Sequence, residues 1–229
     1  MNKNNFLFSL IFLITGLIVG FYASNYINRN AQSAVLQNQP NAPLQNPQVQ
    51  NIVVKDQPAQ GGMLPDVSAV IEKAKNEPNN FEAQIKAGDM YQQIKGFDKA
   101  VAFYEQAHNV KPDNYELIVK IGNAYFDAGQ FETAAKWYEQ ALAKNANDSD
   151  VRTDLGITFV ERANPDFDRA INEFKTSLQT NPKHEPTLYN LAVAHYKKGN
   201  QEEADKILAQ FESINPNSQL VGRLRQVIK

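Results

Sequence analysis

Residues 115–148 read YELIVKIGNAYFDAGQFETAAKWYEQALAKNAND, and this stretch decides the fold. Each half carries small and apolar residues at helical spacing, and a glycine between the halves supplies a stop. The two apolar faces consist of Ile118, Ile121, Gly122 and Tyr125 in the first half and of Ala134, Tyr138 and Ala141 in the second. Because small residues let two backbones approach and the rings fill the space beside them, the stretch predicts a pair of packed helices.

The same pattern recurs along the chain. Gly88, Gly122 and Gly156 are 34 residues apart, whereas Ala192 follows after 36, which locates a two-residue insertion near Asn164. The length of the period and its small, aromatic and proline positions resemble the tetratricopeptide repeat (TPR). The departures from that pattern are Ala146 in place of the closing proline, His195 in place of an aromatic ring, and hydrophilic Gln84 and Arg152 at positions that are often apolar.

This resemblance implies an all-α fold, a TPR α-solenoid in which helix hairpins stack into a right-handed superhelix. The predicted units are an amino-terminal capping helix (63–80), four repeats (81–114, 115–148, 149–184 and 185–218) and a carboxy-terminal capping helix (219–229). Caps are expected at both ends because each repeat buries its faces only against its neighbours.

An amino-terminal segment of different character precedes the repeats. Residues 6–23 carry no charge, and as a helix they would span roughly 27 Å, close to the thickness of a bilayer core. We expect 1–29 to be a signal-anchor transmembrane helix that contacts the membrane through 6–27, with its N-terminus in the cytoplasm. A cleaved signal peptide, whose apolar region is usually shorter, and a buried soluble helix are the alternatives.

Residues 30–62 are rich in Gln, Asn and Pro. Too few apolar side chains are present to offset the entropy lost on ordering, so the composition predicts a disordered linker. The apolar triplet at 52–54 interrupts this run. It is either a short docking strand or an apolar cluster within the linker.

Composition narrows the class of function. The chain has 229 residues, a net charge of −2 and no cysteine. The sequence has no clustered basic face of the kind that nucleic-acid binding needs. Without cysteine, disulfides and thiolate catalysis are excluded. His184 begins a fragment of a zinc-protease motif, but Leu188 occupies the second histidine position and Pro186 breaks the required helix. His195 is predicted to be a core residue, and neither an enzyme nor a cofactor is expected.

The resemblance also implies a binding surface, because the first helix of each TPR pair lines a concave groove that holds extended or helical peptides. The predicted groove residues are Val119, Asn123, Phe126, Asp127, Ile157, Val160, Tyr189, Asn190, Val193 and Tyr196. Their apolar members lie opposite the contacts within each pair, where a merely solvated face would not need them. Alternatively, they pack against the neighbouring repeat or the capping helix.

Polar groups of the groove narrow the class of partner that it is expected to bind. The amides of Asn123 and Asn190 can bond a peptide backbone without reading its side chains. Some relatives bind the carboxylate of chaperones with a basic clamp, but the corresponding positions here are Ile85, Asp89, Asp150 and Asp154. The charge is reversed, which disfavours that activity and would suit a basic segment.

Together these features predict a membrane-tethered, non-enzymatic protein–protein interaction module that holds a protein or peptide. The expected location is the bacterial inner membrane, with the repeats in the periplasm, and the role an envelope assembly factor or scaffold. Its architecture is similar to that of TPR components of cytochrome c maturation systems. A self-assembling scaffold, a homo-oligomer whose groove receives another copy, is the alternative.

Overall fold

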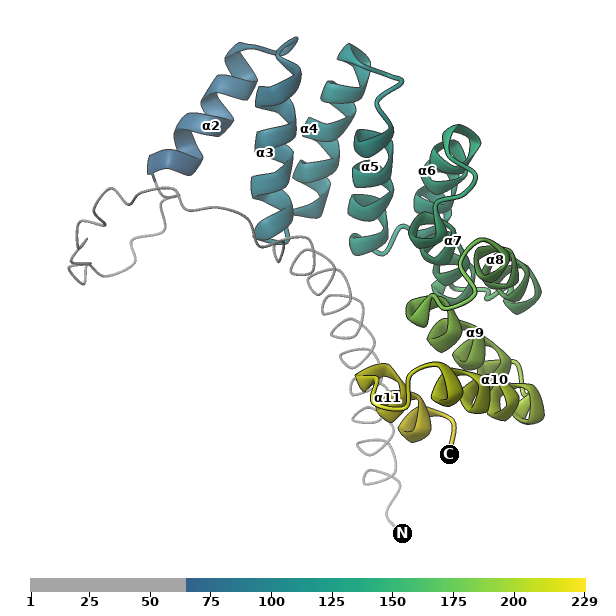
Figure 1. Cartoon of the computed structure of the whole chain (residues 1–229). Coiled ribbons are helices and arrows are strands. Elements are labelled where there is room, and N and C mark those ends of the chain that lie inside the picture. Colours follow the sequence, from purple (N-terminus) through teal and green to yellow (C-terminus); the bar gives the residue numbers. More distant parts are fainter. Residues whose placement is uncertain (1–64) are drawn as a thin grey trace, which may run out of the picture. The chain divides into compact units, whose positions relative to one another are not determined.

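A computed structural model describes residues 65–229, and these residues form α-helices and no strand (Figure 1). The helices are α2 (Pro65–Asn76), α3 (Phe81–Gln93), α4 (Phe97–Val110), α5 (Tyr115–Asp127), α6 (Phe131–Lys144), α7 (Ser149–Glu161), α8 (Phe167–Thr180), α9 (Glu185–Lys197), α10 (Gln201–Ile214) and α11 (Gln219–Val227). Between residues 65 and 229, none of them combines the length and the apolar character needed to cross a membrane. The predicted transmembrane segment (1–29) and linker (30–62) lie outside the described residues.

Local sequence sets where the helices begin. The side chains of Asn80, Asn114 and Asp148 precede α3, α5 and α7, and each accepts a hydrogen bond from the backbone N–H three residues later, at 3.0, 2.8 and 2.9 Å. Such bonds satisfy donors that the first turn of a helix leaves unpaired. Gly129 and Gly199, with φ of 74° and 88°, turn the chain between the two helices of their pairs.

Within each pair, a small residue faces a large one. A Cβ added at Gly88 would lie 2.4 Å from Cε1 of Tyr104, and one at Gly122 would lie 2.7 Å from Cε1 of Tyr138. At Gly156 the same atom would lie 2.4 Å from Cε1 of Phe174. These distances confirm that glycine allows the close approach of two helices. In the fourth pair the small residue is Ala192, and the facing position holds a smaller side chain, Leu208.

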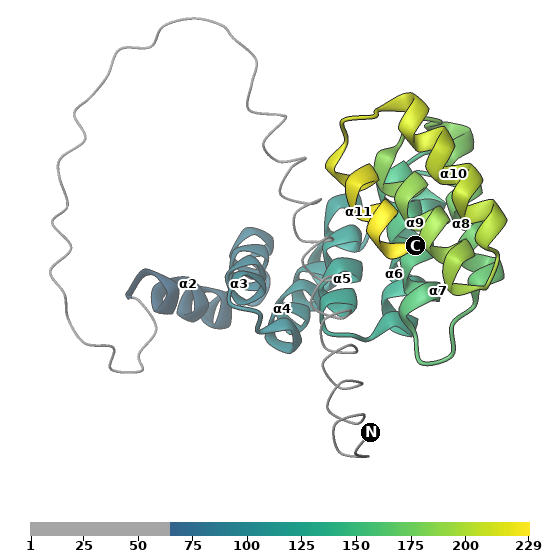
Figure 2. The same ribbon diagram turned by 90° about the horizontal axis from the view of Figure 1, so that it is seen from below.

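The helices stack in chain order, and each contacts the next (Figures 1 and 2). The first helices of the last units also contact one another, α7 with α9 and α9 with α11. The last helix, α11, buries Val221 and Leu224 and leaves Gly222 and Arg225 exposed. The predicted all-α TPR solenoid is therefore confirmed for the described residues.

Candidate functional site

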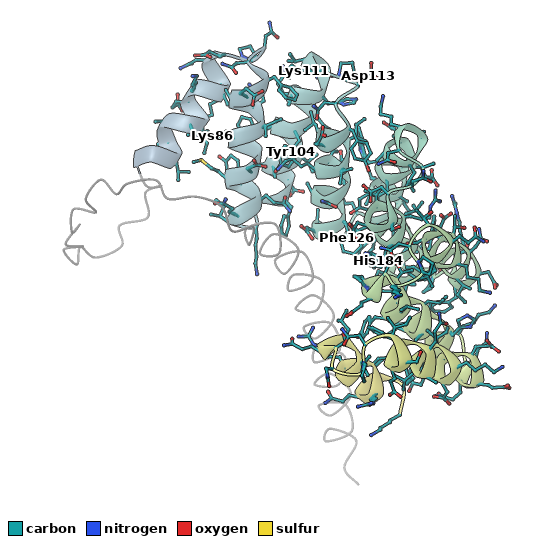
Figure 3. The ribbon with its side chains drawn as sticks, in the orientation of Figure 1. Lys86, Tyr104, Lys111, Asp113, Phe126 and His184 are labelled. Carbon is teal, nitrogen blue, oxygen red and sulfur yellow. The ribbon has the colours of Figure 1, made fainter. Side chains whose placement is uncertain are left out.

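The predicted groove belongs to the first helices of the four pairs, α3, α5, α7 and α9. We number the residues of each helix from its first residue, so that the ninth residue follows the small residue of each pair. The ninth residues are Asp89, Asn123, Ile157 and Val193. We call the side of the four helices that carries them the groove face; Figure 3 shows its Phe126 side chain.

In the first two repeats, the ninth residue is polar and accepts a hydrogen bond from a tyrosine hydroxyl. Tyr104 donates to Oδ1 of Asp89 at 2.6 Å, and Tyr138 donates to Oδ1 of Asn123 at 2.8 Å. Lys120 lies 2.7 Å from the same oxygen of Asp89. Burial and the hydrogen bond to Asp89 raise the pKa of Tyr104 above its usual range. The hydroxyl therefore stays protonated and fixes the carboxylate.

In the last two repeats, the same positions are apolar. The ring facing Gly156 is Phe174, which has no hydroxyl, and the ninth residue there is Ile157. In the fourth repeat Leu208 replaces the ring, and the ninth residue is Val193. Ile157 and Val193 are 3% and 4% exposed, so the ninth residues of these two repeats are buried.

The ten predicted groove residues divide into two equal sets. The first set is buried and comprises Phe126, Ile157, Val160, Tyr189 and Val193; the second is half-buried and comprises Val119, Asn123, Asp127, Asn190 and Tyr196. Phe126 stacks edge-on against Phe131 of the following helix, with ring centroids 5.2 Å apart. Packing within the domain thus accounts for Phe126, and the buried residues offer a ligand little surface. Their role in peptide binding stays a prediction.

The two asparagines are already engaged by the chain. Oδ1 of Asn123 accepts from Tyr138, and Nδ2 of Asn190 donates to the carbonyl oxygen of Pro186 at 2.8 Å. Each amide therefore spends one of its groups inside the domain. That these two amides bond a peptide backbone stays a prediction.

Ion pairs and hydrogen bonds also engage the acids of the groove face. Asp127 accepts from Gln92 at 2.5 Å, and Glu161 lies 2.9 Å from Nζ of Lys197. Asp150 lies 2.9 Å from Nε2 of His184, and its side chain is 56% exposed. Of these acids, Asp150 is the one that combines a large exposed area with an internal partner.

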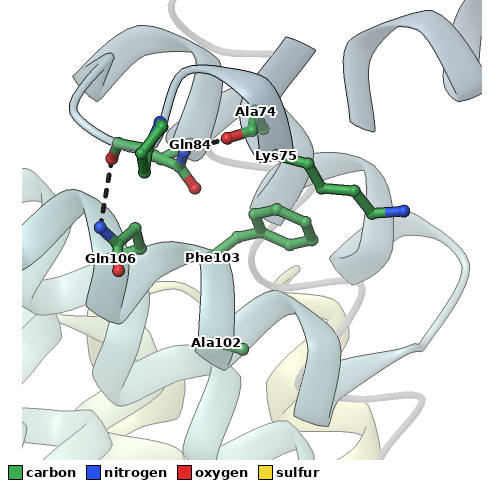
Figure 4. A pocket seen from close by; sticks show the side chains of 7 residues that line it. Ala74, Lys75, Gln84, Ala102, Phe103 and Gln106 are labelled. Atoms are coloured by element: carbon green, nitrogen blue, oxygen red, sulfur yellow. Dashed lines mark hydrogen bonds between the residues drawn. The ribbon is translucent and has the colours of Figure 1, made fainter. Parts of the chain in front are cut away.

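A pocket of about 240 Å³ lies away from the groove face, between α2 and α4 (Figure 4). It is lined by Ala74, Lys75, Pro78, Gln84, Ala102, Phe103 and Gln106. Buried Gln84 donates to the carbonyl oxygens of Ala74 and Glu77, at 2.6 and 3.2 Å. A hydrophilic residue at this position is therefore satisfied by the backbone of the capping helix.

Repeat spacing explains why the pocket exists. The residues equivalent to Ala74 in the next three units are His108, Leu142 and Leu178. His108 fills its interval by stacking edge-on against Trp137, with centroids 5.0 Å apart. Ala74 is too small to reach Phe103 in the same way. The small side chain at this position can be recognised from the sequence, but only after residue 74 is aligned with its equivalents in the later repeats.

Two histidines of the described chain differ in their surroundings. His195 is 7% exposed, which confirms the prediction of a core position, and burial holds its pKa below the usual range. His184 instead joins a group of hydroxyls that sequence reasoning missed. Among residues 65–229, no cluster of His, Asp and Glu is arranged to hold a metal ion.

Comparison with known proteins identifies the repeat family of this architecture. The tetratricopeptide repeat family matches residues 95–154 and 162–228. None of the curated proteins matches the chain significantly.

Solved structures share the fold at low sequence identity. YrrB, described as a TPR protein with an unusual peptide-binding site, is 21% identical, with a TM-score of 0.60 over 70% of this chain and 81% of YrrB. MamA from Desulfovibrio magneticus RS-1 is 14% identical, with a TM-score of 0.60 over 67% of this chain and 85% of MamA. A TPR protein from Parabacteroides merdae is 18% identical, with a TM-score of 0.57 over 65% of this chain and 58% of its own. Because the family matches more than half of the sequence and the helix pairs carry its small-against-large packing, the chain belongs to the tetratricopeptide repeat family.

Proposed function

We propose that this protein is a non-enzymatic interaction module that holds a protein or peptide along its groove face. The observation that carries the proposal is the row of half-buried side chains that α5 and α9 retain on that face, with Val119 and Tyr196 as its apolar members. Half-buried apolar and amide groups give a ligand both contact area and hydrogen bonds. The YrrB structure, similar in fold, is described as having a peptide-binding site.

The ligand is a segment with basic residues opposite the third repeat. Asp150 and Asp154 lie one turn apart on α7, and the carboxylate of Asp150 is largely exposed. Complementary charge across a binding surface favours the matching partner and speeds its association.

Cross-linking tests the groove directly. A photoreactive residue at Val119 or Tyr196 is expected to capture one discrete partner in cells, because both positions are half-buried on the groove face. The matched control is Gln140, which is exposed on the second helix of a pair. Capture of the same partner from Gln140, or persistence of the Val119 adduct when Tyr196 is replaced by alanine, would contradict the proposal.

The same proposal places the module at the outer face of the bacterial inner membrane, as an envelope assembly factor or scaffold anchored by residues 1–29. The chain contains no cysteine, so a single one introduced at exposed Gln140 reports on one site. A membrane-impermeant maleimide is expected to label it in intact spheroplasts. Labelling only after lysis would place the repeats on the cytoplasmic side.

A further inference from the structure

The pocket between α2 and α4 is an interval that the next repeat fills with a ring. There, His108 lies edge-on against Trp137 with the ring centroids 5.0 Å apart. One period earlier, the same two positions hold Ala74 and Phe103. The methyl group of Ala74 leaves a volume of about 240 Å³ beside the Phe103 ring. The chain itself therefore shows that a planar ring suits this interval.

The Phe103 ring forms one wall of the pocket. It stacks on Tyr91, with the ring centroids 5.6 Å apart and an angle of 12° between the rings. Phe103 is half-buried, so part of its ring stays open on the pocket side (Figure 4). Ala74 and Ala102 line the pocket as well and add methyl groups to its surface. A second aromatic ring placed here would gain apolar contact area and a ring–ring contact with Phe103.

Gln84 supplies the pocket with a hydrogen-bond acceptor. This residue is 1% exposed, and its Nε2 donates to the carbonyl oxygens of Ala74 and Glu77 at 2.6 and 3.2 Å. Both amide protons are thereby used, which fixes the orientation of the amide. Oε1 is turned toward the pocket, and none of residues 65–229 donates a hydrogen bond to it (Figure 4). A buried acceptor of this kind favours a ligand that brings an N–H or O–H group.

The open interval and the acceptor occur together at one place in residues 65–229. The equivalent residues of the later repeats are larger than Ala74 and lack the amide of Gln84, being His108, Leu142 and Leu178 at the first position and Ile118, Arg152 and Leu188 at the second. The later repeats pack without either feature. Their coincidence beside α2 therefore indicates a binding site.

The volume and the acceptor together select the ligand. Small-molecule sites usually measure about 300–1,000 Å³, which is more than the 240 Å³ of this pocket. Since an apolar cavity of about 150 Å³ already holds benzene, the pocket has room for the two-ring indole group. Aromatic side chains seated in pockets contribute much of the binding energy at protein–protein interfaces. Indole also carries the N–H group that Oε1 of Gln84 requires.

We propose that this pocket is a docking site for a tryptophan side chain of another protein. The indole ring lies against Phe103, and its N–H donates to Oε1 of Gln84. The chain contains one tryptophan, Trp137, which is half-buried and engaged with His108, so a second copy of the chain does not supply the ring. The proposal does not depend on the function proposed for the groove face.

Fluorine NMR of the full chain with N-acetyl-5-fluorotryptophanamide tests the site. The probe is expected to bind with a Kd of about 1 mM, as one buried ring allows. N-acetyltryptophanamide should displace it about three- to tenfold more effectively than the analogue in which sulfur replaces the indole N–H, because sulfur cannot donate to Gln84. Equal displacement by the two compounds would overturn the role of Gln84, and this comparison needs no variant.

Two alanine-to-leucine variants on α2 locate the bound probe. Ala74→Leu fills the pocket with the side chain found at its equivalents in the third and fourth units and should weaken binding by at least about tenfold. Ala69→Leu is the matched control, because it makes the same change at an exposed position of the same helix and should bind like the wild type. Thermal unfolding shows that both variants remain folded. Unchanged binding by Ala74→Leu, or an equal loss in both variants, would overturn the proposal.

Random peptides displayed on phage test whether the ring belongs to a polypeptide. Peptides are selected on the wild type after those that also bind Ala74→Leu have been removed. Tryptophan is expected to be enriched at one position of the selected peptides, and its replacement by phenylalanine should weaken binding because phenylalanine has no donor. Selection of peptides without tryptophan would overturn the proposed partner.

Discussion

The first two repeats and the last two form similar helix pairs from different chemistry. In the first two, a tyrosine faces the glycine of the pair and donates to a polar ninth residue, Asp89 or Asn123. In the third, Phe174 has no hydroxyl and the ninth residue is Ile157. The polar ninth residue and the hydroxyl thus occur together or not at all, which indicates that the ninth residue matches the ring behind it.

Removing the ring that faces the glycine should have the largest effect on stability, and it should distinguish the two kinds of pair. Tyr138→Ala and Phe174→Ala should each lower the free energy of unfolding by about 3–5 kcal/mol, because each leaves a large cavity. Tyr138→Ala should cost about 1 kcal/mol more, because it also removes the hydroxyl that donates to Oδ1 of Asn123. Urea unfolding measures both values. Equal losses would show that the hydroxyl contributes nothing to the packing.

Substitution of the glycine that faces the ring should have the next largest effect on stability. Gly156→Ala places a Cβ against the Phe174 ring and should cost about 1–3 kcal/mol through overpacking. Adding Phe174→Leu reproduces the alanine and leucine of the fourth repeat and should recover most of that loss. Gly222→Ala is the control, since nothing lies within 4 Å of its added Cβ, and it should stabilise by up to about 1 kcal/mol. If the double variant were no better than Gly156→Ala, the small-against-large rule would fail.

A smaller effect tests the hydroxyl alone. Tyr138→Phe should cost about 1–1.5 kcal/mol, because the hydrogen bond from the Tyr138 hydroxyl to the partly buried amide of Asn123 is lost. Combining it with Asn123→Ile converts the second pair to the chemistry of the third, and the double variant should lie within about 0.5 kcal/mol of the Asn123→Ile variant. A double-mutant cycle from chemical unfolding gives the coupling energy. A coupling energy near zero would break the comparison.

The smallest effect is a dependence on pH in the fourth repeat. His195 replaces the aromatic residues found at its position earlier in the chain, and burial lowers its pKa. The unfolded state therefore takes up a proton first, so the stability that His195 contributes is present above its unfolded pKa and is lost as the pH falls. His195→Phe should remove this loss between pH 7 and 5, as measured by thermal unfolding. A larger loss in the variant than in the wild type would contradict the assignment.

Much of the fold followed from repeat spacing, because a residue's role was fixed by its equivalents one period away. Gly122 and Tyr138 were paired correctly on that basis, and so was the core position of His195. The groove was harder to predict, since an apolar residue such as Ile157 looks the same in sequence whether it is buried or offered to a ligand. The cluster of Thr153 and Thr187 joins residues one period apart, so a repeat-by-repeat comparison of polar substitutions would have found it.

The pocket beside Ala74 bears on how the array comes apart. Because each unit is stabilised only by its neighbours, the contact of α2 with the first repeat, where no side chain fills the pocket, should unfold first. Amide hydrogens of α2 should therefore exchange with solvent before those of α5 or α8, so that melting advances inward from this end.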